Sequence, residues 1–293
     1  MSKIAFIGLG HMGGPMAANL VKAGRDVHGF DLVPALRDAA AADAVKIAPT
    51  AADAVRDADI VITMLPAGKH VLSVWQEILS LAKTGALFID SSTIDVESAH
   101  KAHELAQQAG VASVDAPVSG GTGGAKAGTL TFMCGGADAA FASARPVLEH
   151  MGKKIVHCGG AGAGQAAKIC NNMILGATMI ATAEAFVLAE KLGLSHQALF
   201  DVASTSSGQS WSLTNYCPVP GPVPASPANN DYKPGFAAAL MLKDLKLSQQ
   251  AAASSGAATP MGATAAQLYA LFNAAGHADD DFSGIIRFLR GEG

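Results

Sequence analysis

Short hydrophobic runs alternate with amphipathic stretches through the first half of the chain. Each run has the length of a buried strand, and each amphipathic stretch repeats its apolar positions with the helical period. Strands are predicted over 3–8, 26–31, 60–65, 86–90, 111–115, 129–134 and 154–158. Helices are predicted over 13–23, 51–57, 70–83, 95–109 and 138–150. Strands that alternate with helices are typical of a parallel sheet with crossover helices, so this half is predicted to be an α/β domain.

The strand pattern ends near Gly164, and long alanine-rich helical patterns follow it. Helices are predicted over 164–192, 195–204, 236–254, 260–274 and 282–289. Segment 217–235 holds six prolines, too many for a helix or a central strand, and is predicted to be a stiff surface loop. This shift predicts two domains, a largely parallel sheet domain over 1–163 and an all-α domain over 164–293.

Composition and charge argue against several classes of partner. Half of the 293 residues are hydrophobic and the formal net charge is -4, so no basic surface for nucleic acid is expected. The four cysteines stand far apart, with no pair at metal-ligand spacing, which fits reduced thiols. The chain begins with a strand pattern rather than a signal or transit segment, so a cytoplasmic location is expected.

The most apolar stretch of the chain, 173–188, does not predict a membrane span. Thr178, Thr182 and Glu184 interrupt it, and it is shorter than the roughly 20 apolar residues that cross a bilayer. It is therefore predicted to be a buried core helix, and no membrane partner is expected.

A glycine turn follows the first predicted strand and opens the first predicted helix. It consists of Gly8, Leu9, Gly10, His11, Met12 and Gly13. In such a turn the first glycine permits a tight bend, the second lets a pyrophosphate approach the backbone, and the third lets the helix pack closely on the strand. The N–H groups at the helix start then face the phosphates. The turn therefore predicts a dinucleotide site in a Rossmann-type domain.

The second predicted strand ends at Asp31, about 20 residues beyond the turn, where a carboxylate accepts hydrogen bonds from a ribose diol. A carboxylate at this place repels the 2′-phosphate of NADP. The following Leu32, Val33 and Pro34 offer no arginine to bind that phosphate, so NAD is the predicted cofactor. The alternative is that Asp31 is a plain strand-end or helix-cap residue.

Two further segments follow predicted strands and are expected to border the cofactor, because ligands collect at the carboxyl ends of the strands in an open parallel sheet. Leu65 and Pro66 follow one strand, and the segment 91–93, Ser-Ser-Thr, follows the next. For the second segment, capping of the helix before Asp95 remains an open alternative.

A glycine-rich turn, 116–124, follows the predicted strand that ends at Asp115. Its exposed N–H groups and the Ser119 hydroxyl are suited to binding an anion, and a substrate carboxylate is the expected ligand. A flexible connector is the alternative, although small polar residues and glycines at the carboxyl end of a strand favour a site.

Lys168 and Asn172 are four residues apart in the first turns of a predicted helix, so they share one face. The helix start disfavours an ammonium group, and desolvation and a nearby nicotinamide cation would also favour neutral lysine. Neutral Lys168 would take a hydroxyl proton while Asn172 holds the substrate oxygen. The alternative is that Lys168 extends to solvent, as most lysines do.

Lys243 lies in the otherwise apolar segment 236–247 and is expected to point into a cleft. A salt-bridged surface stripe with Asp244 and Lys246 is the alternative, and the pattern does not decide between the two.

No metal is expected from the sequence. His100 and His103 stand three apart on a polar predicted helix, which is typical of a solvated face rather than of a ligand pair. The acidic run 279–281 lacks the ligand spacing of a calcium loop.

The chain resembles the β-hydroxyacid dehydrogenase family along nearly its whole length. The matching segments are 6–13 with Met16 and Asn19, 115–121, 128–130, 164–172 and 243–245. Segments 226–232 and 279–283 resemble the 3-hydroxyisobutyrate branch rather than tartronate semialdehyde or glyoxylate reductases.

The resemblance implies a role for each matching site residue. It implies Lys168 as the catalytic residue. The implied substrate contacts are Ser119, Gly120, Gly121 and Asn172, and the implied cofactor contacts are Leu65, Pro66, Thr93 and Lys243. It also implies a homodimer or homotetramer, with the helical domain at the interface, and a place in valine breakdown.

The resemblance implies NAD-dependent oxidation of 3-hydroxyisobutyrate to methylmalonate semialdehyde, with Lys168 as general acid and base. A related enzyme acting on tartronate semialdehyde, glyoxylate or a serine-like hydroxy acid is one alternative. A dinucleotide-binding sensor without turnover is another. Replacement of Lys168 discriminates, because a dehydrogenase would lose its rate and still bind NAD.

Overall fold

The computed structural model describes residues 2–292, and the chain divides into two compact units, Met1–Lys168 and Ile169–Gly293. The long helix α8, Ala163–Lys191, begins in the first unit and continues into the second. The domain boundary expected after residue 163 stays a prediction.

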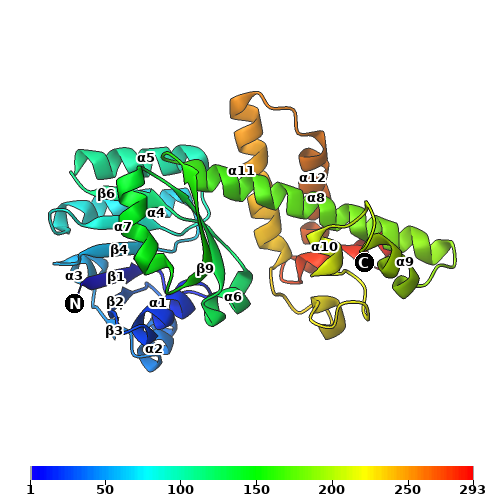
Figure 1. Cartoon of the computed structure of the whole chain (residues 1–293), viewed down its shortest axis with the longest axis horizontal. Coiled ribbons are helices and arrows are strands. Elements are labelled where there is room, and N and C mark those ends of the chain that lie inside the picture. Colours follow the sequence, from blue (N-terminus) through cyan, green and yellow to red (C-terminus); the bar gives the residue numbers. More distant parts are fainter. Residues whose placement is uncertain (1, 293) are drawn as a thin grey trace. The chain divides into compact units, whose positions relative to one another are not determined.

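The first unit contains one sheet of nine strands (Figure 1). Its order is β3-β2-β1-β4-β5-β6-β8-β7, with β9 paired to β8, and the pairs from β3 to β6 are all parallel. Only the pairs of β8 with β6 and β7 are antiparallel, so the sheet is largely parallel, as predicted. The strands are β1 Lys3–Ile7, β2 Asp26–Phe30, β3 Lys46–Ile47, β4 Ile60–Thr63, β5 Leu87–Asp90, β6 Ala112–Asp115, β7 Val118–Ser119, β8 Leu130–Gly135 and β9 Gly152–Gly159.

Helices cover both faces of this sheet, as a parallel sheet requires. One face packs against α1, α2, α6 and α7, with Phe6, Met16 and Phe132 buried between the layers. The other face packs against α3, α4 and α5, with Trp75 and Phe88 in its core. The helices are α1 Gly13–Lys22, α2 Pro34–Ala42, α3 Ala51–Val55, α4 Gly68–Ile78, α5 Val96–Gln108, α6 Gly121–Ala127 and α7 Asp138–Leu148.

All seven predicted strands of this unit are present, but two strands and two helices were missed. Strands β3 and β7 have two residues each, too few to show a period. Helix α2 buries only Ala40, so it has no apolar stripe to recognise. Helix α6 replaces the predicted open turn after Gly120. Its glycines disfavour a helix, and a long-range bond from Asn19 Nδ2 to the carbonyl of Ala125 (2.7 Å) holds it on α1.

The second unit contains only helices and irregular segments among its described residues. These helices are the continuation of α8, then α9 His196–Ala203, α10 Trp211–Thr214, α11 Ala238–Ser255, α12 Pro260–Phe272 and α13 Ile285–Arg290. In Figure 1, α8 passes across α11 and α12. Glycines allow this close packing, because a methyl group on Gly176 would lie 3.1 Å from the Leu245 side chain and one on Gly262 would lie 2.6 Å from Met173 Sδ.

Helix α8 packs one face into the core of the second unit through Met179, Ala183 and Phe186. Its opposite face exposes Ile174 and Leu188. By length and hydropathy α8 could cross a membrane, and 39% of its most apolar window is buried. One such helix is weak evidence for a span, because core helices of soluble proteins pass the same test.

The proline-rich segment 217–235 contains no α-helix or strand, as predicted, and only a short 3-10 helix, Pro227–Asn230; it is anchored in the core rather than lying wholly on the surface. Cys217 and Val219 are fully buried. The Ser226 hydroxyl donates to the carbonyl of Cys217 (2.5 Å), and the Tyr232 hydroxyl donates to that of Pro218 (2.8 Å). These bonds fix a segment that cannot form a regular ladder.

A buried polar cluster lies at the carboxyl ends of β4 and β5 and fixes the loops that follow. Asp90 is 2% exposed, and its Oδ1 accepts from the hydroxyls of Thr63 (2.7 Å) and Ser92 (2.6 Å). Ser92 Oγ in turn accepts from the backbone N–H of Leu65 (2.7 Å). Burial, partly offset by the bonds from Ser92 and Thr63, raises the pKa of Asp90 from 3.8 to about 6. The Asp90 carboxyl group therefore fixes the loop after β4, and its ionisation inside the protein is unfavourable.

This raised pKa predicts a pH dependence of stability. Asp90 binds its proton more tightly in the folded chain, so its contribution is fully present below pH 3.8 and is lost as the pH rises through about 6. The loss amounts to about 3 kcal/mol by linkage. In urea titrations the free energy of unfolding of Asp90→Asn should therefore depend less steeply on pH between pH 5 and 7.5 than that of the unmodified chain.

Asp59→Asn is the matched control for this experiment. Its carboxylate bonds to Lys83 Nζ (2.6 Å), which lowers its pKa, so it stays ionised across the tested range. The control should keep the slope of the unmodified chain. Parallel curves for Asp90→Asn and the unmodified chain would show that Asp90 does not titrate in this range.

Candidate cofactor and substrate site

The glycine turn joins β1 to α1, and its three glycines have different surroundings. Gly8 has a φ of 95°, and a methyl group there would collide with the carbonyl oxygen of Met64. A methyl group on Gly13 would collide with the carbonyl oxygen of Gly8. A methyl group on Gly10 would meet nothing within 4 Å. The first and third glycines are therefore required by packing, whereas the second faces open space into which a pyrophosphate fits.

The start of α1 is suited to an anion. Its N-cap residue, Met12, makes no side-chain capping bond, and its first turn contains no acidic residue. Backbone N–H groups at such a helix start carry a partial positive charge and need acceptors. The turn thus fits the phosphates of a dinucleotide, and bound NAD would supply the hydride acceptor at this edge of the sheet.

Asp31 lies directly after β2 and is bonded to the glycine turn. Its Oδ2 accepts from the N–H of Leu9 (2.7 Å), and its Oδ1 accepts from the N–H of Val33 (2.8 Å). It does not cap α2, whose N-cap position is Val33. The carboxylate therefore stands beside the phosphate-binding turn, where a ribose diol would lie.

One charged residue near Asp31 was missed in the sequence analysis. Arg37, on the unpredicted helix α2, donates from Nη1 to the carbonyl of Asp31 (2.8 Å) and lies 5.9 Å over the Phe30 ring. An arginine is therefore close to the ribose position after all, although it is six residues beyond Asp31. It bears on the choice between NAD and NADP.

The loops after β4 and β5 are tied together next to the cofactor turn. The bond from Leu65 N–H to Ser92 Oγ joins them directly. The capping alternative for segment 91–93 is wrong, because Asp95 is the N-cap of α5 and accepts from the N–H of Ser98 (2.7 Å). Ser92 instead bonds Asp90, and Thr93, the next residue, is half-buried.

The predicted substrate turn lies at the carboxyl end of β6 and leads through β7 into α6. Ser119 is half-buried and Gly120, with a φ of 134°, is exposed. Side chains disfavour this backbone conformation, so glycine is required at position 120. The turn therefore presents a serine hydroxyl and backbone N–H groups on one short segment, and these donors are suited to binding a carboxylate.

Lys168 is buried, with 6% of its surface exposed, so the alternative that it extends to solvent is wrong. It lies in the second turn of α8, one turn before Asn172, which is 2% exposed. The two side chains therefore share the face predicted for them. The structure thus buries both residues on one helix, and the catalytic role expected for Lys168 stays a prediction.

In the second unit, Asn172 bonds Asp244, a residue that the sequence analysis considered only as part of a surface stripe. Its Nδ2 donates to Asp244 Oδ2 (2.5 Å), and its Oδ1 accepts from Asn171 (2.9 Å). Asp244 is buried on α11, and neighbouring Lys243 is half-buried, so Asp244 is not part of a surface stripe. A buried acid within an apolar helix was the signal that could have identified it.

Most of the predicted site residues lie at one edge of the first unit. The glycine turn follows β1 and Asp31 follows β2. Leu65 lies just beyond β4, Thr93 lies just beyond β5, and Ser119 is the last residue of β7. Lys168 ends this unit, whereas Asn172 and Lys243 belong to the second. Among the described residues, no group of three or more His, Cys, Asp or Glu side chains could hold a metal ion.

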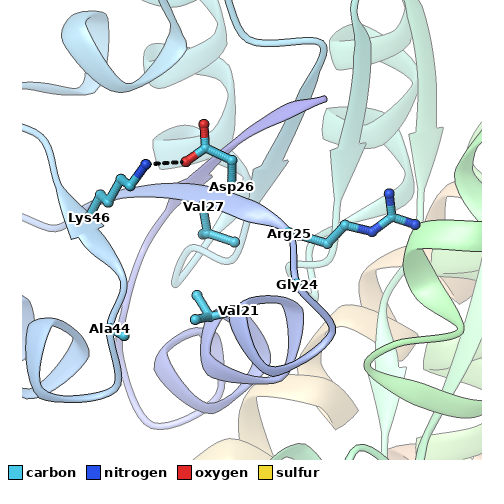
Figure 2. A pocket seen from close by; sticks show the side chains of 7 residues that line it. All are labelled: Val21, Gly24, Arg25, Asp26, Val27, Ala44 and Lys46. Atoms are coloured by element: carbon cyan, nitrogen blue, oxygen red, sulfur yellow. Dashed lines mark hydrogen bonds and ion pairs between the residues drawn. The ribbon is translucent and has the colours of Figure 1, made fainter. Parts of the chain in front are cut away.

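A hollow at the opposite edge of the sheet is not part of this site (Figure 2). It lies around the start of β2 and is lined by Val21, Gly24, Arg25, Asp26, Val27, Ala44 and Lys46. Figure 2 shows Lys46 paired with Asp26 (2.7 Å). Arg25 donates to His150 Nε2 (3.2 Å). Both cations of the hollow thus have partners, so it offers no evident anion site.

Comparisons with known proteins agree with this geometry. Residues 3–160 match the family model described as the NAD binding domain of 6-phosphogluconate dehydrogenase. Residues 162–289 match the model described as the NAD-binding of NADP-dependent 3-hydroxyisobutyrate dehydrogenase. Together the two models cover nearly the whole chain.

Similar proteins carry dehydrogenase names over their full length. A probable 3-hydroxyisobutyrate dehydrogenase of Mycobacterium tuberculosis is 57% identical over 99% of this chain and 98% of that protein. An NAD-dependent L-serine dehydrogenase of Pseudomonas aeruginosa is 49% identical over 97% of this chain and 96% of that protein. A solved structure of Mycobacterium tuberculosis 3-hydroxyisobutyrate dehydrogenase with L-serine has a TM-score of 0.96 and 57% identity, covering 99% of both chains. With these matches, the glycine turn and the buried lysine identify the chain as a member of the 3-hydroxyisobutyrate dehydrogenase family, which consists of NAD-binding oxidoreductases of the β-hydroxyacid dehydrogenase type.

Proposed function

We propose that this chain oxidises 3-hydroxyisobutyrate to methylmalonate semialdehyde with NAD, as a step of valine breakdown. The observation that carries the proposal is a lysine, Lys168, buried one helical turn before a buried Asn172. A buried lysine beside an amide is suited to general acid and base chemistry on a hydroxyl group. The similarity to proteins named for this reaction supports the choice of substrate.

In this mechanism, the chain's residues bind the acid and remove one proton. Ser119, Gly120 and Gly121 bind the substrate carboxylate through the hydroxyl and backbone N–H groups. Asn172 orients the reacting hydroxyl, and neutral Lys168 takes its proton at Nζ as hydride leaves the carbon. In the reverse direction Lys168 returns that proton. The further cofactor contacts that we propose are Leu65, Pro66, Thr93 and Lys243.

The choice of NAD over NADP rests on Asp31. Its carboxylate stands at the glycine turn, so a 2′-phosphate there would meet a like charge. Arg37 is already bonded to the carbonyl of Asp31 and lies over Phe30, so it only partly offsets this repulsion. A strong preference for NAD is therefore expected.

L-Serine is the second candidate substrate, and two observations favour it. A relative at 49% identity is named an NAD-dependent L-serine dehydrogenase, and the solved structure at 57% identity was determined with L-serine. Serine and 3-hydroxyisobutyrate share a carboxylate and a hydroxyl on the 3-carbon. They differ at the 2-position, where one carries an ammonium and the other a methyl group.

Steady-state kinetics on the purified chain test the substrate and cofactor together. Values of kcat/KM for 3-hydroxyisobutyrate, L-serine and glycerate, each with NAD and with NADP, should be highest for 3-hydroxyisobutyrate with NAD. An apolar environment for the 2-methyl group would disfavour the ammonium of L-serine, so a difference of at least ~10-fold over L-serine is expected. A higher value for L-serine would transfer the proposal to that substrate, and a preference for NADP would overturn the role given to Asp31.

Replacing Lys168 tests the mechanism and the sensor alternative. Lys168→Ala should lower kcat by ~10²-fold to 10⁴-fold, because a positioned general base contributes about that much. Its dissociation constant for NADH, measured by fluorescence titration, should stay within twofold. An unchanged kcat would remove Lys168 from the mechanism. If the unmodified chain bound NAD and turned over no hydroxy acid, the alternative of a dinucleotide-binding sensor would be supported.

Self-association through the second unit is also proposed. Leu188, Leu192 and Val202 expose 59%, 74% and 64% of their surfaces, which is unusual for large apolar side chains in the same part of a chain. Sedimentation velocity should show two or four subunits per particle, and a monomer at micromolar concentration would contradict the proposal.

The expected cytoplasmic location stays a prediction.

A further inference from the structure

His103 does not lie on a solvated face, contrary to the sequence-based expectation for the pair His100 and His103. Its side chain is only 13% exposed, and both ring nitrogens have partners within the first unit. Nε2 lies 2.9 Å from Asp115 Oδ1, and Nδ1 lies 2.7 Å from Ser113 Oγ. An ionised carboxylate only accepts, so Nε2 donates to Asp115, and in the neutral ring Nδ1 accepts from the Ser113 hydroxyl. The imidazole thus supports the Asp115 carboxylate from α5.

Asp115 in turn binds the beginning of α8. Its Oδ1 accepts from the N–H of Gly162 (2.8 Å) and its Oδ2 accepts from the N–H of Gln165 (2.9 Å). The first N–H groups of a helix have no partner within the helix, and a negative charge there is favourable. Asp115 is 2% exposed, so these bonds are shielded from water. A residue of β6 therefore supplies the cap that α8 lacks in its own sequence.

The contact between β6 and α8 is close on the backbone as well. A methyl group on Gly164 would lie 2.7 Å from the carbonyl oxygen of Asp115 and 2.8 Å from its Oδ2. Gln165 adds a second attachment, since its Nε2 donates to the carbonyl of Ser92 (2.7 Å) and its Oε1 accepts from the N–H of Ile94 (3.1 Å). His100 Nε2 lies 3.0 Å from the carbonyl oxygen of Ala161. The start of α8 is thus held on several sides.

Lys168 is the first residue beyond this held segment that the proposed reaction uses. It follows Gln165 by three residues, within one turn of a rigid helix, so a shift of the helix start moves its Nζ by a similar amount. Asp115 is also the residue from which the turn to Ser119 begins. One carboxylate thus connects the segment that carries the base to the segment that would bind the substrate.

We propose that His103, acting through Asp115, is a positioning residue that fixes Lys168 relative to the turn at Ser119. This inference rests on the proposed function, because it assigns a role within that reaction. In the proposed mechanism, His103 contacts neither the substrate nor the cofactor. Without the His103 imidazole, the Asp115 carboxylate loses one hydrogen-bond donor and the side chain that packs against it. Both hydrogen bonds from Asp115 to the start of α8 then weaken. Misplacement of a catalytic group by about 1 Å is enough to cost a large factor in rate.

Kinetics of two His103 variants and one control test this proposal. His103→Ala should lower kcat about tenfold or more while the dissociation constant for NADH stays within twofold, with kcat expressed per NADH-binding site. His103→Gln should recover kcat to within about threefold of the unmodified chain, because the glutamine amide places a donor near the position of Nε2. His28→Ala is the control, since His28 forms a comparable histidine–aspartate pair with Asp26 (3.2 Å) away from α8. The control should keep kcat.

An unchanged kcat per site in His103→Ala would overturn the proposal, as would a His103→Gln enzyme as slow as His103→Ala. If His103→Ala does not fold, Ser113→Ala removes the bond to Nδ1 alone, and kcat should then fall about threefold. A Ser113→Ala enzyme with unchanged kcat would count against the proposal in that case.

Hydrogen exchange separates this inference from the proposed function. Peptides covering 159–168 should exchange faster in His103→Ala than in the unmodified chain, while peptides from β1 and α1 keep their protection. If no hydroxy acid were turned over, the proposed function would fail, and this exchange difference would still report on the attachment of α8. Equal exchange in both proteins would overturn the attachment itself.

Discussion

The carboxylate of Asp115 binds the first turn of α8, and much of the candidate site depends on that bond. Parallel strands end at one edge of a sheet, so a residue at the end of β6 lies close to segments that leave the same edge beside it. Asp115 uses this position to accept from Gly162 and Gln165, two residues that begin the helix carrying Lys168. The helix start needs acceptors and the buried carboxylate needs donors, so each satisfies the other.

A second buried carboxylate, Asp90, performs a related task one strand away. It accepts from Ser92, which in turn accepts from Leu65 N–H, so the loops after β4 and β5 are held at a common place. Gln165 bonds the carbonyl of Ser92 and thereby joins this cluster to α8. Loops that bind a cofactor must keep their geometry although they have no regular ladder, and buried polar networks of this kind supply the missing constraints. The cost appears in Asp90, whose pKa rises because ionisation inside the sheet is unfavourable.

Helices that start close to strand ends require glycine at two close contacts near the site. Gly164 touches the backbone and carboxylate of Asp115, and Gly13 lies against the backbone of Gly8. In both cases a helix must start close to a strand end, and a methyl group would separate them. Close approach of helix starts to the sheet edge brings backbone N–H groups to the place where phosphates and carboxylates bind.

The sequence by itself determined the elements whose signals are local. The alternation of strand and helix patterns, the glycine turn with Asp31 beyond it, and the helix with Lys168 and Asn172 on one face all follow from spacing, because burial imposes a period on neighbouring residues. Only the tertiary structure decided what depends on partners far along the chain. Asn172 bonds Asp244, which is 72 residues away in the sequence, Asn19 bonds the backbone of α6, and His103 bonds Asp115. A hydrogen bond between distant residues leaves no periodic trace in the sequence, so these contacts could be recognised only once folding had brought the partners together.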